Sequence, residues 1–466
     1  MSRKQQQKVM PPLAGLATYE QAARVGYSVE ENVTRLCRYN YVKTRLVEIS
    51  AAFMNPAPEW EVKTALSLHL YLDAEHSQAI RQRITELRNP PPRLDESPDA
   101  RLTALMEEAL RAQNTLELLV GVYRVLRPAL RAALQQHLDA VNPVFDFPTC
   151  RLLRIALPEE AQMIAWGEEA LAALMTDAET EQQAEAWERH LRAYLQAAGG
   201  IAGDEVIPDD LALPAPRANG AFVPSVEPRR DARSGAIYNF YYRPDAVYRD
   251  EKAAPDERTL ALMYKRLHEM DVPEMMSSIL LQTPGKPWEY YRDMARQLWD
   301  EARHALMGEV WFVARGIDWT WTPNHVGWCR YLNLCLTPLE RHITLYGIEQ
   351  NLMHAQTGKR YEWQITQQAN DLLATYVQDY DWADEVLHAQ IGRRWLKPEV
   401  GDVKALLARY QEIWERPIAM PPPPTGPAPQ VDWWPEFVRA ALGKESSSQA
   451  GLGDLEWSRD TVSSSG

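Results

Sequence analysis

Two five-residue stretches decide how this chain is interpreted: Asp300-Glu-Ala-Arg-His304 and Asp384-Glu-Val-Leu-His388. In each stretch a glutamate precedes a histidine by three residues, and residues spaced i and i+3 on an α-helix share one face. A carboxylate and an imidazole placed in this way can bind one metal ion together. The second stretch follows the first by 84 residues, which predicts two separate helices of the same kind.

The apolar pattern and the helix breakers around these stretches predict four helices. Their expected bounds are 256–282, 287–316, 328–356 and 361–396. Two helices with a Glu-x-x-His pair each, together with one glutamate from each of two other helices, form the two-metal site of a four-helix bundle. We therefore expect an all-α chain whose C-terminal half holds a two-metal carboxylate site.

The other two glutamate ligands have competing candidates. On the third helix, Glu349 is preferred over Glu340. On the first helix, Glu269 matches the height of the second-helix glutamate, whereas Glu274 lies lower by roughly 7–8 Å at ~1.5 Å per residue. Glu274, however, has a counterpart at Glu48 in a weak internal repeat of the chain. Both first-helix candidates are kept.

An aspartate precedes the glutamate in both stretches. We expect Asp300 and Asp384 each to accept the remaining imidazole N–H of the histidine on the opposite motif, which would fix its tautomer. The metal ligands are predicted among Glu269, Glu274, Glu301, His304, Glu349, Glu385 and His388. Carboxylates mixed with imidazoles suit iron or manganese better than structural zinc. The expected cofactor is a pair of iron ions, with manganese or a mixed Mn/Fe pair as the alternative.

The N-terminal block is also predicted to be helical. Its expected helices are 28–54, 59–88, 98–139, 148–175 and 178–198, with a split or bend expected near Pro128. It carries an incomplete set of the same ligand types, namely Glu48, Asp73, His76, Glu117 and Glu160. Met163 stands where a second histidine is needed. We interpret this block as a degenerate copy of the bundle with a structural role.

Composition shifts place the expected domain boundaries. They are 13–200 for the N-terminal bundle, 201–254 for an irregular linker, 255–400 for the di-metal bundle and 401–466 for short helices with a disordered Pro/Ser-rich tail. Within the last region, residues 432–442 are predicted to dock as a short helix. The N-terminal residues 1–12 show no apolar leader segment, and no run of ~18 apolar residues predicts a membrane span.

Charge and cysteine content exclude several classes of protein. The 466 residues carry Lys+Arg 50 against Asp+Glu 64, a net charge of −14, whereas a surface that binds nucleic acid would be basic. The four cysteines have no C-x-x-C spacing, so neither a disulfide framework nor a structural zinc site is expected. These features favour a cytoplasmic protein.

Several strings of the C-terminal half resemble those of a known superfamily. They are Asp300-Glu-Ala-Arg-His304-Ala-Leu-Met, Pro323-Asn-His325-Val-Gly-Trp328, Ile348-Glu349 and Asp384-Glu-Val-Leu-His388-Ala-Gln-Ile-Gly392-Arg-Arg-Trp395. Over residues 255–400 the chain resembles the ferritin-like di-iron carboxylate superfamily, and within it a bacterial ferritin-like domain family of unassigned function. The resemblance implies that Glu301, His304, Glu349, Glu385 and His388 are ligands, along with a first-helix glutamate. The family pattern has two glutamates like Glu269 and Glu274, so the choice between them stays open.

Three functions compete at this point. The favoured one is an enzyme, a non-heme di-iron or Mn/Fe oxidoreductase that activates dioxygen to oxidise a small organic substrate in an apolar pocket. We expect Trp299, Met307, Trp311 and Tyr346 to line that pocket. The alternatives are a ferritin-like iron-binding or ferroxidase protein and a non-catalytic helical scaffold with a structural metal site.

The expected partners follow from the favoured function. They are the small-molecule substrate and dioxygen, and neither nucleic acid nor a membrane. No Gly-rich nucleotide loop or flavin fingerprint occurs in the sequence, so electrons must come from a partner protein, the substrate or a chemical reductant. An electron-donor protein and a second copy of the chain are therefore candidate partners. The sequence does not name the substrate.

Overall fold

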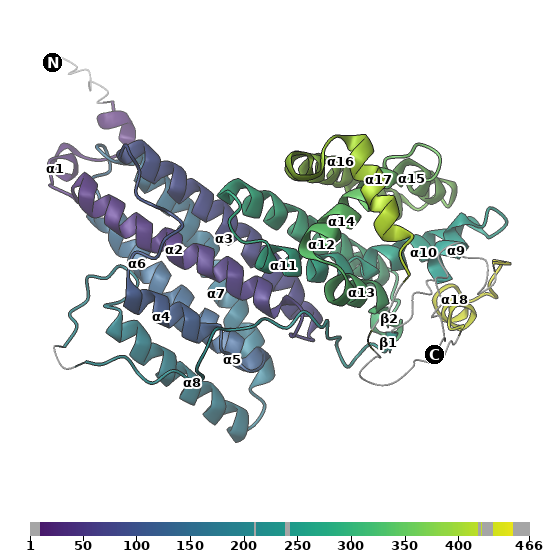
Figure 1. The fold of residues 1–466 in the computed structure, drawn as a ribbon, viewed down its shortest axis with the longest axis horizontal. Coiled ribbons are helices and arrows are strands. Elements are labelled where there is room, and N and C mark those ends of the chain that lie inside the picture. The colour runs from purple at the N-terminus through teal and green to yellow at the C-terminus, as the bar shows by residue number, and fades with distance from the viewer. Residues whose placement is uncertain (1–9, 209–210, 238–242, 418–420, 422–431, 451–466) are drawn as a thin grey trace, which may run out of the picture. The chain divides into compact units, whose positions relative to one another are not determined.

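Nearly every regular element of this chain is a helix. The structure, a computed structural model, describes residues 10–208, 211–237, 243–417, 421 and 432–450. Apart from two paired two-residue strands, the regular elements in these residues are helices (Figure 1). The predicted all-α class is confirmed. None of the described helices is long and apolar enough to cross a membrane.

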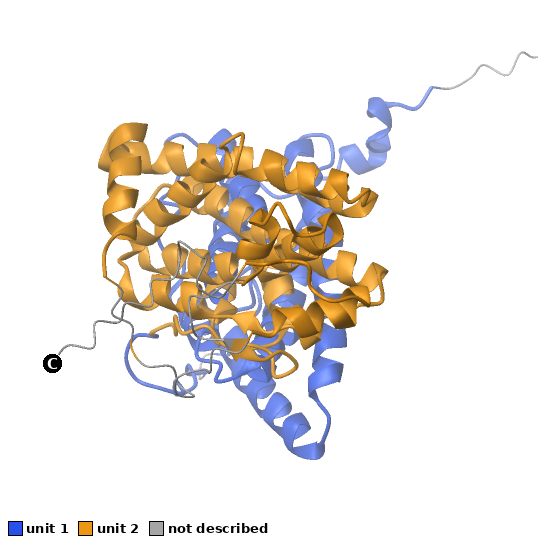
Figure 2. Ribbon diagram, turned by 90° about the vertical axis from the view of Figure 1, so that its right-hand side faces the viewer, with its two compact units in different colours: residues 1–49, 72–222 blue, residues 50–71, 223–466 orange. Residues whose placement is uncertain are grey.

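The chain forms two compact units (Figure 2). One consists of residues 1–49 and 72–222, and the other of residues 50–71 and 223–466. The segment 50–71 was predicted to belong to the N-terminal bundle, but it is part of the second unit. That segment joins the second unit because the Asn55 side chain donates to the Glu274 carbonyl at 3.0 Å and accepts from the Asn333 amide at 3.1 Å.

The first unit contains the N-terminal helices. Its elements are η1 (Leu13–Gly15), α1 (Tyr19–Ala22), α2 (Val29–Met54, to Ile49), α3 (Trp60–Leu87, from Leu72), α4 (Ala100–Ala109), α5 (Thr115–Leu119), the π-helical η2 (Val120–Leu126), α6 (Arg127–Ala140), α7 (Phe147–Leu174) and α8 (Ala178–Ala197). The predicted helix 98–139 is therefore broken into several pieces. Asn114 caps a new helix by accepting from the Glu117 amide, and Pro128 lacks the N–H that would continue the ladder from η2.

The second unit contains the remaining elements. They are β1 (Ala236–Ile237), α9 (Arg243–Arg249), α10 (Pro255–His268), α11 (Asp271–Gln282), α12 (Trp288–Ala314), η3 (Trp319–Trp321), β2 (Asn324–His325), α13 (Gly327–Cys335), α14 (Pro338–Leu352), α15 (Lys359–Gln368), α16 (Leu372–Val400), α17 (Val403–Trp414) and α18 (Trp434–Leu442). Strands β1 and β2 pair in parallel, with Ala236 opposite Asn324. The predicted linker therefore holds a strand and the helix α9, which packs on α10.

Four helices of this unit pack in a closed ring. α11 contacts α12, α12 contacts α16, α16 contacts α14, and α14 contacts α11 (Figure 1). Helix α10 also packs on α12, and α15 packs on both α10 and α16. The ring brings the long helix α12 and the long helix α16, which carry the two Asp-Glu-x-x-His stretches, side by side.

Three of the four helices predicted for 255–400 are each broken into two. The breaks lie near Pro273, before Pro338 and at Asn370. Pro273 cannot donate to the Glu269 carbonyl, so the first helix ends at His268 and restarts as α11. Pro338 begins α14 under a capping box formed by Thr337. Asn370 takes a left-handed backbone conformation with φ of 53° between α15 and α16. The breaks matter because the residues beside them enter the site described below.

The C-terminal part contributes to the core of the second unit. Helix α18 buries Trp434 and Phe437, and the Trp434 indole donates to Glu257 at 3.0 Å. Ser446 and the Ser447 amide also donate to this carboxylate, each at 2.6 Å. The docked helix at 432–442 thus appears where it is predicted, but the serines at 446 and 447 are bound to α10. The rest of the predicted disordered tail, 418–431 apart from Pro421 and 451–466, lies outside the described residues.

Candidate metal centre

Helix α12 aims one histidine and several carboxylates at α16, and α16 does the same in return. Glu301 and His304 lie one turn apart on α12, and Glu385 and His388 lie one turn apart on α16; all four are buried. The i, i+3 spacing places each pair on one helix face. Because α12 and α16 pack together, the two pairs meet.

The first cluster consists of Glu301, Glu349, Glu385 and His388. One ligand atom from each lies within 4.8 Å of the ligand atoms of the others. The His388 Nδ1 atom is 3.1 Å from Glu301 Oε1 and 3.3 Å from Glu385 Oε2. Glu349 reaches the cluster from α14, and Glu340 does not, because it caps that helix at its N-terminus. Four side chains from three helices thus surround one position for a metal ion.

The second cluster consists of Glu269, His304 and Asp381, whose ligand atoms also lie within 4.8 Å of one another. His304 Nδ1 is 3.4 Å from Asp381 Oδ1 and 3.5 Å from Glu269 Oε2. It is also 3.6 Å from Glu301 Oε2, a ligand in the first cluster. The two clusters are therefore adjacent, and Glu301 lies between their histidines.

The first-helix glutamate in this arrangement is Glu269. It is the C-cap residue of α10, at the break that Pro273 causes. Glu274, which the sequence analysis keeps as an equal candidate, is not part of either cluster. Its carboxylate pairs with the Lys63 ammonium at 2.6 Å and with Arg230. The helix break separates the two glutamates, so only the one at the break faces His304.

The two aspartates lie behind the histidines. His304 Nε2 is 3.1 Å from Asp384 Oδ2, and His388 Nε2 is 3.5 Å from Asp300 Oδ2. Each aspartate therefore faces the histidine of the other helix and leaves the Nδ1 atom of that histidine turned to the clusters. Arg303 joins the two aspartates, with its Nη2 atom 2.7 Å from Asp300 and 2.5 Å from Asp384.

Replacement of Asp384 by alanine is expected to weaken metal binding by about 10–100-fold, because it frees the His304 ring to turn and lowers its basicity. Mn²⁺ titration calorimetry of the purified protein measures the change. The matched control is Asp379→Ala, which removes an exposed carboxylate from the same helix. Equal Mn²⁺ affinity for the two variants would show that Asp384 does not support His304.

Three buried atoms of the clusters make no well-oriented hydrogen bond among the described residues, although Glu301 Oε1 lies 3.1 Å from His388 Nδ1 and Glu269 Oε2 lies 3.5 Å from His304 Nδ1: they are Glu269 Oε2, Glu301 Oε1 and His304 Nδ1. A buried polar atom without a partner costs about 1–3 kcal/mol. All three atoms belong to the clusters, and the clusters together hold five carboxylates. Atoms of this kind, aimed at one another in a buried space, are the donor set that binds iron or manganese. The residues present therefore fit the metal pair that the sequence predicts.

Neighbouring cations and protonation reduce the negative charge of the five clustered carboxylates. Burial and the adjacent Glu385 carboxylate raise the pKa of Glu349 well above its usual range. Burial also opposes ionisation of Glu385, but the Lys359 ammonium holds its pKa well below the usual range. The Gln297 side chain donates to Glu349 at 3.2 Å. Among the carboxyl groups of the first cluster, Glu349 is thus the one whose surroundings most favour the protonated form.

Four residues of this site were not predicted from the sequence. They are all buried and contact predicted ligands: Asp381, Gln297, Lys359 and Arg266. Asp381 could have been found, because it precedes Glu385 by four residues and shares its helix face. No local sequence pattern predicts that Lys359 and Arg266 contact the clustered carboxylates, because these contacts depend on how α15 and α10 pack in the unit.

A small cavity adjoins the clusters. It has a volume of about 120 Å³, and the side chains of Glu269, Glu301, Glu349 and Glu385 form one wall. The other walls are mostly apolar and comprise Asp271, Val272, Met275, Trp328, Cys329, Leu332, Leu345, Ile348 and Leu352. None of the four residues predicted to line the pocket does so: Trp299, Met307 and Trp311 belong to the core around α10, and Tyr346 packs against Gly392.

The N-terminal unit also brings acidic groups and a histidine together: ligand atoms of Asp73, His76 and Glu160 lie within 4.8 Å of one another, with two cationic side chains among them. Asp73 accepts from Lys43 Nζ and from Arg127 Nη2, each at 2.7 Å, and Glu160 also pairs with both cations. Burial opposes ionisation of Asp73, but Arg127 and Lys43 hold its pKa below the usual range. His76 lies nearby and pairs with Glu159 at 2.6 Å. Two carboxylates balanced by two cations need no metal ion.

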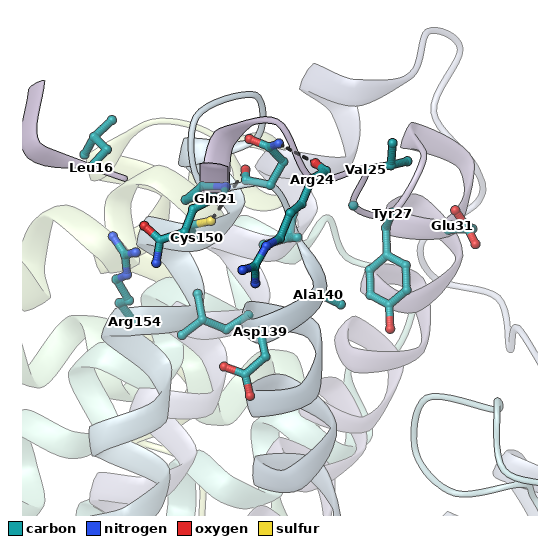
Figure 3. Close-up of a pocket in the computed structure, with 15 residues that line it drawn as sticks. Leu16, Gln21, Arg24, Val25, Tyr27, Glu31, Asp139, Ala140, Cys150 and Arg154 are labelled. Atoms are coloured by element: carbon teal, nitrogen blue, oxygen red, sulfur yellow. Dashed lines mark hydrogen bonds between the residues drawn. The ribbon is translucent and has the colours of Figure 1, made fainter. Parts of the chain in front are cut away.

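The other two candidates in the N-terminal block lie elsewhere. Glu48 pairs with Arg45 at 2.6 Å near the surface, and Glu117 pairs with Arg217. Met163 is buried. A groove of about 640 Å³ also occurs in this unit, with Arg24, Asp139 and Arg154 among its labelled side chains (Figure 3). It contains none of the clustered carboxylates, and so it adds no site of this type.

No family model, curated protein or solved structure matches this chain. Function is therefore inferred from the geometry of the two clusters and the cavity beside them.

Proposed function

We propose that this protein is a ferritin-like, non-heme di-iron or Mn/Fe oxidoreductase that activates dioxygen to oxidise a small, largely apolar organic substrate. One observation carries the proposal: five carboxylates and two histidines from one bundle surround two adjacent positions, with an apolar cavity against them. The ring of α11, α12, α16 and α14, with Glu269 at the end of α10, supports the ferritin-like arrangement.

When bound, the metal pair would supply the electron-transfer chemistry with dioxygen that amino-acid side chains lack. The chain holds His304 and His388 in place through Asp384 and Asp300. In hydroxylation, N-oxygenation or desaturation, the substrate gives one pair of electrons and an electron donor gives the other. Dioxygen leaves as water, apart from any oxygen atom that the substrate retains.

The size and lining of the cavity limit the substrate. Its volume of about 120 Å³ is below the roughly 300–1,000 Å³ of pockets for drug-sized ligands. An apolar cavity of about 150 Å³ accepts benzene, so a single ring or a short aliphatic group is the largest fragment that fits. Since the walls away from the carboxylates are mostly apolar, the part of the substrate that enters is expected to be uncharged.

The same cavity favours an oxidoreductase over the alternatives. An iron-storage protein needs a polar route by which ions reach its site, whereas this cavity approaches the carboxylates through apolar side chains such as Val272, Leu345 and Leu352. A purely structural metal site has no need of space beside its ligands. Here four of the ligand carboxylates line that space.

The protein loaded anaerobically with Fe²⁺ is expected to consume dioxygen faster when a compound that fits the cavity is present. A dioxygen electrode, run with a set of small aromatic and aliphatic compounds, measures this rate. Ile348→Trp should abolish the stimulation because Ile348 lines the cavity, and it should keep the bound iron. The control Leu339→Trp adds the same bulk at an exposed position of the same helix.

Two outcomes would contradict the proposal. One is a rate of dioxygen consumption, after Fe²⁺ loading, no higher than that of iron in buffer. The other is stimulation that survives in Ile348→Trp but disappears in Leu339→Trp, which would place the substrate away from the cavity.

A further inference from the structure

The Lys359 side chain reaches into the space between the two clusters. Its Nζ atom is 2.8 Å from Asp381 Oδ1 and 2.9 Å from Asp381 Oδ2. It is also 2.8 Å from Glu385 Oε1 and 3.8 Å from Glu269 Oε1. The side chain is fully buried. An ammonium group thus contacts three of the carboxylates that surround the metal positions.

The start of α15 places Lys359 there. Lys359 is the first residue of that helix, and α15 packs on α16 and on α10. Gly358 precedes it, and a Cβ atom at this glycine would lie 2.0 Å from the Leu352 carbonyl oxygen. Any other residue would therefore push the start of α15 away from the end of α14. The close approach that glycine allows brings the lysine up to the ligands.

The two metal positions differ in how their charge is already balanced. In the second cluster, Glu269 and Asp381 each contact both Lys359 and Arg266. In the first cluster, Glu385 contacts Lys359, and Glu301 pairs with the imidazoles of His388 and His304 among the described residues. The first position therefore has one lysine contact, whereas the second has contacts from both a lysine and an arginine.

We propose that the Lys359 ammonium competes with the metal ion of the second cluster, so that the protein binds one divalent ion tightly and a second ion only when this side chain leaves. The inference rests on the proposed metal centre. A divalent ion bound by Glu269, His304 and Asp381 would repel an ammonium group that contacts two of the same residues. Departure of Lys359 would also release Glu385, a member of the first cluster, from its ion pair.

Mn²⁺ binding to the full-length protein tests the competition. Wild-type protein is expected to keep one Mn²⁺ per chain after gel filtration, and to bind a second ion at least about tenfold more weakly in calorimetry. Lys359→Met should keep two, and its electron paramagnetic resonance spectrum should change from that of an isolated Mn²⁺ ion to that of a coupled pair. Lys265→Met is the control, because Lys265 is a largely buried lysine of this unit that pairs with Glu362, which belongs to neither cluster.

A second measurement covers the case in which Lys359→Met does not fold. Anomalous scattering from wild-type crystals, soaked at low and at high Mn²⁺, should show the first position filling before the second, with Lys359 displaced only at high Mn²⁺. Two ions of equal affinity in wild-type protein, or the same gain in Lys265→Met, would overturn the inference and leave the metal centre in place. Absence of Mn²⁺ and Fe²⁺ binding in every variant would overturn both the inference and the proposed function.

Discussion

Wild-type protein is expected to retain at least one iron or manganese ion per chain through gel filtration, and the double variant Glu301→Ala, His388→Ala to retain none. Both residues belong to the first cluster, where their ligand atoms lie within 4.8 Å of those of Glu349 and Glu385. Loss of a residue that merely orients a ligand weakens binding by about 10–100-fold. Loss of two ligands should therefore weaken it by more than about 100-fold. Elemental analysis of the purified proteins measures the metal content.

A matched double variant separates this effect from a general loss of charge. Glu289→Ala, His354→Ala removes the same two residue types from exposed positions of the second unit, and it should keep the wild-type metal content. Thermal unfolding of both variants in a chelator checks that each one is folded. If the two double variants hold equal amounts of metal, the clusters are not a metal centre.

Arg127→Met is expected to destabilise the first unit by about 3–5 kcal/mol, the usual cost when one partner of a buried ion pair is removed. Arg127 is fully buried and pairs with both Asp73 and Glu160. In the variant only Lys43 remains to balance these two carboxylates. Because two units need not unfold together, amide hydrogen exchange of peptides from α6 and α7 is the appropriate measurement.

The control for this variant is Arg124→Met. Arg124 lies one helical turn earlier and pairs with Glu168, and both side chains are partly exposed. Exposed pairs of this kind contribute about 0–1 kcal/mol, so the exchange rates in α6 and α7 should change little. Equal destabilisation by the two substitutions would mean that the buried network does not hold the first unit together.

The buried carboxylates of the two units differ in the number of Lys and Arg side chains that face them. In the first unit Lys43 and Arg127 balance Asp73 and Glu160 completely. In the second unit, Lys359 and Arg266 face five carboxylates. A buried excess of negative charge is costly unless a cation joins it. This difference in balance is why metal binding is proposed for the second unit alone.

Much of the site follows from local spacing in the sequence. The i, i+3 pairs Glu301–His304 and Glu385–His388 share a helix face wherever the helices lie, because helical periodicity alone sets that geometry. The flanking Asp300 and Asp384 face across to the opposite histidines once α12 and α16 pack against each other. The helical class and most helix bounds also follow from apolar periodicity and from breakers such as prolines.

Other features required the tertiary structure. Glu269 rather than Glu274 lies in the second cluster because the helix breaks near Pro273 and the C-terminal end of α10 faces His304. Lys359 enters the site because α15 packs on α16, and the cavity walls come from α11, α13 and α14. Each of these depends on contacts between segments far apart in the chain. The sequence by itself thus determined which residue types could bind metal, and only the packing of the helices decided which of them lie together and which lysine contacts them.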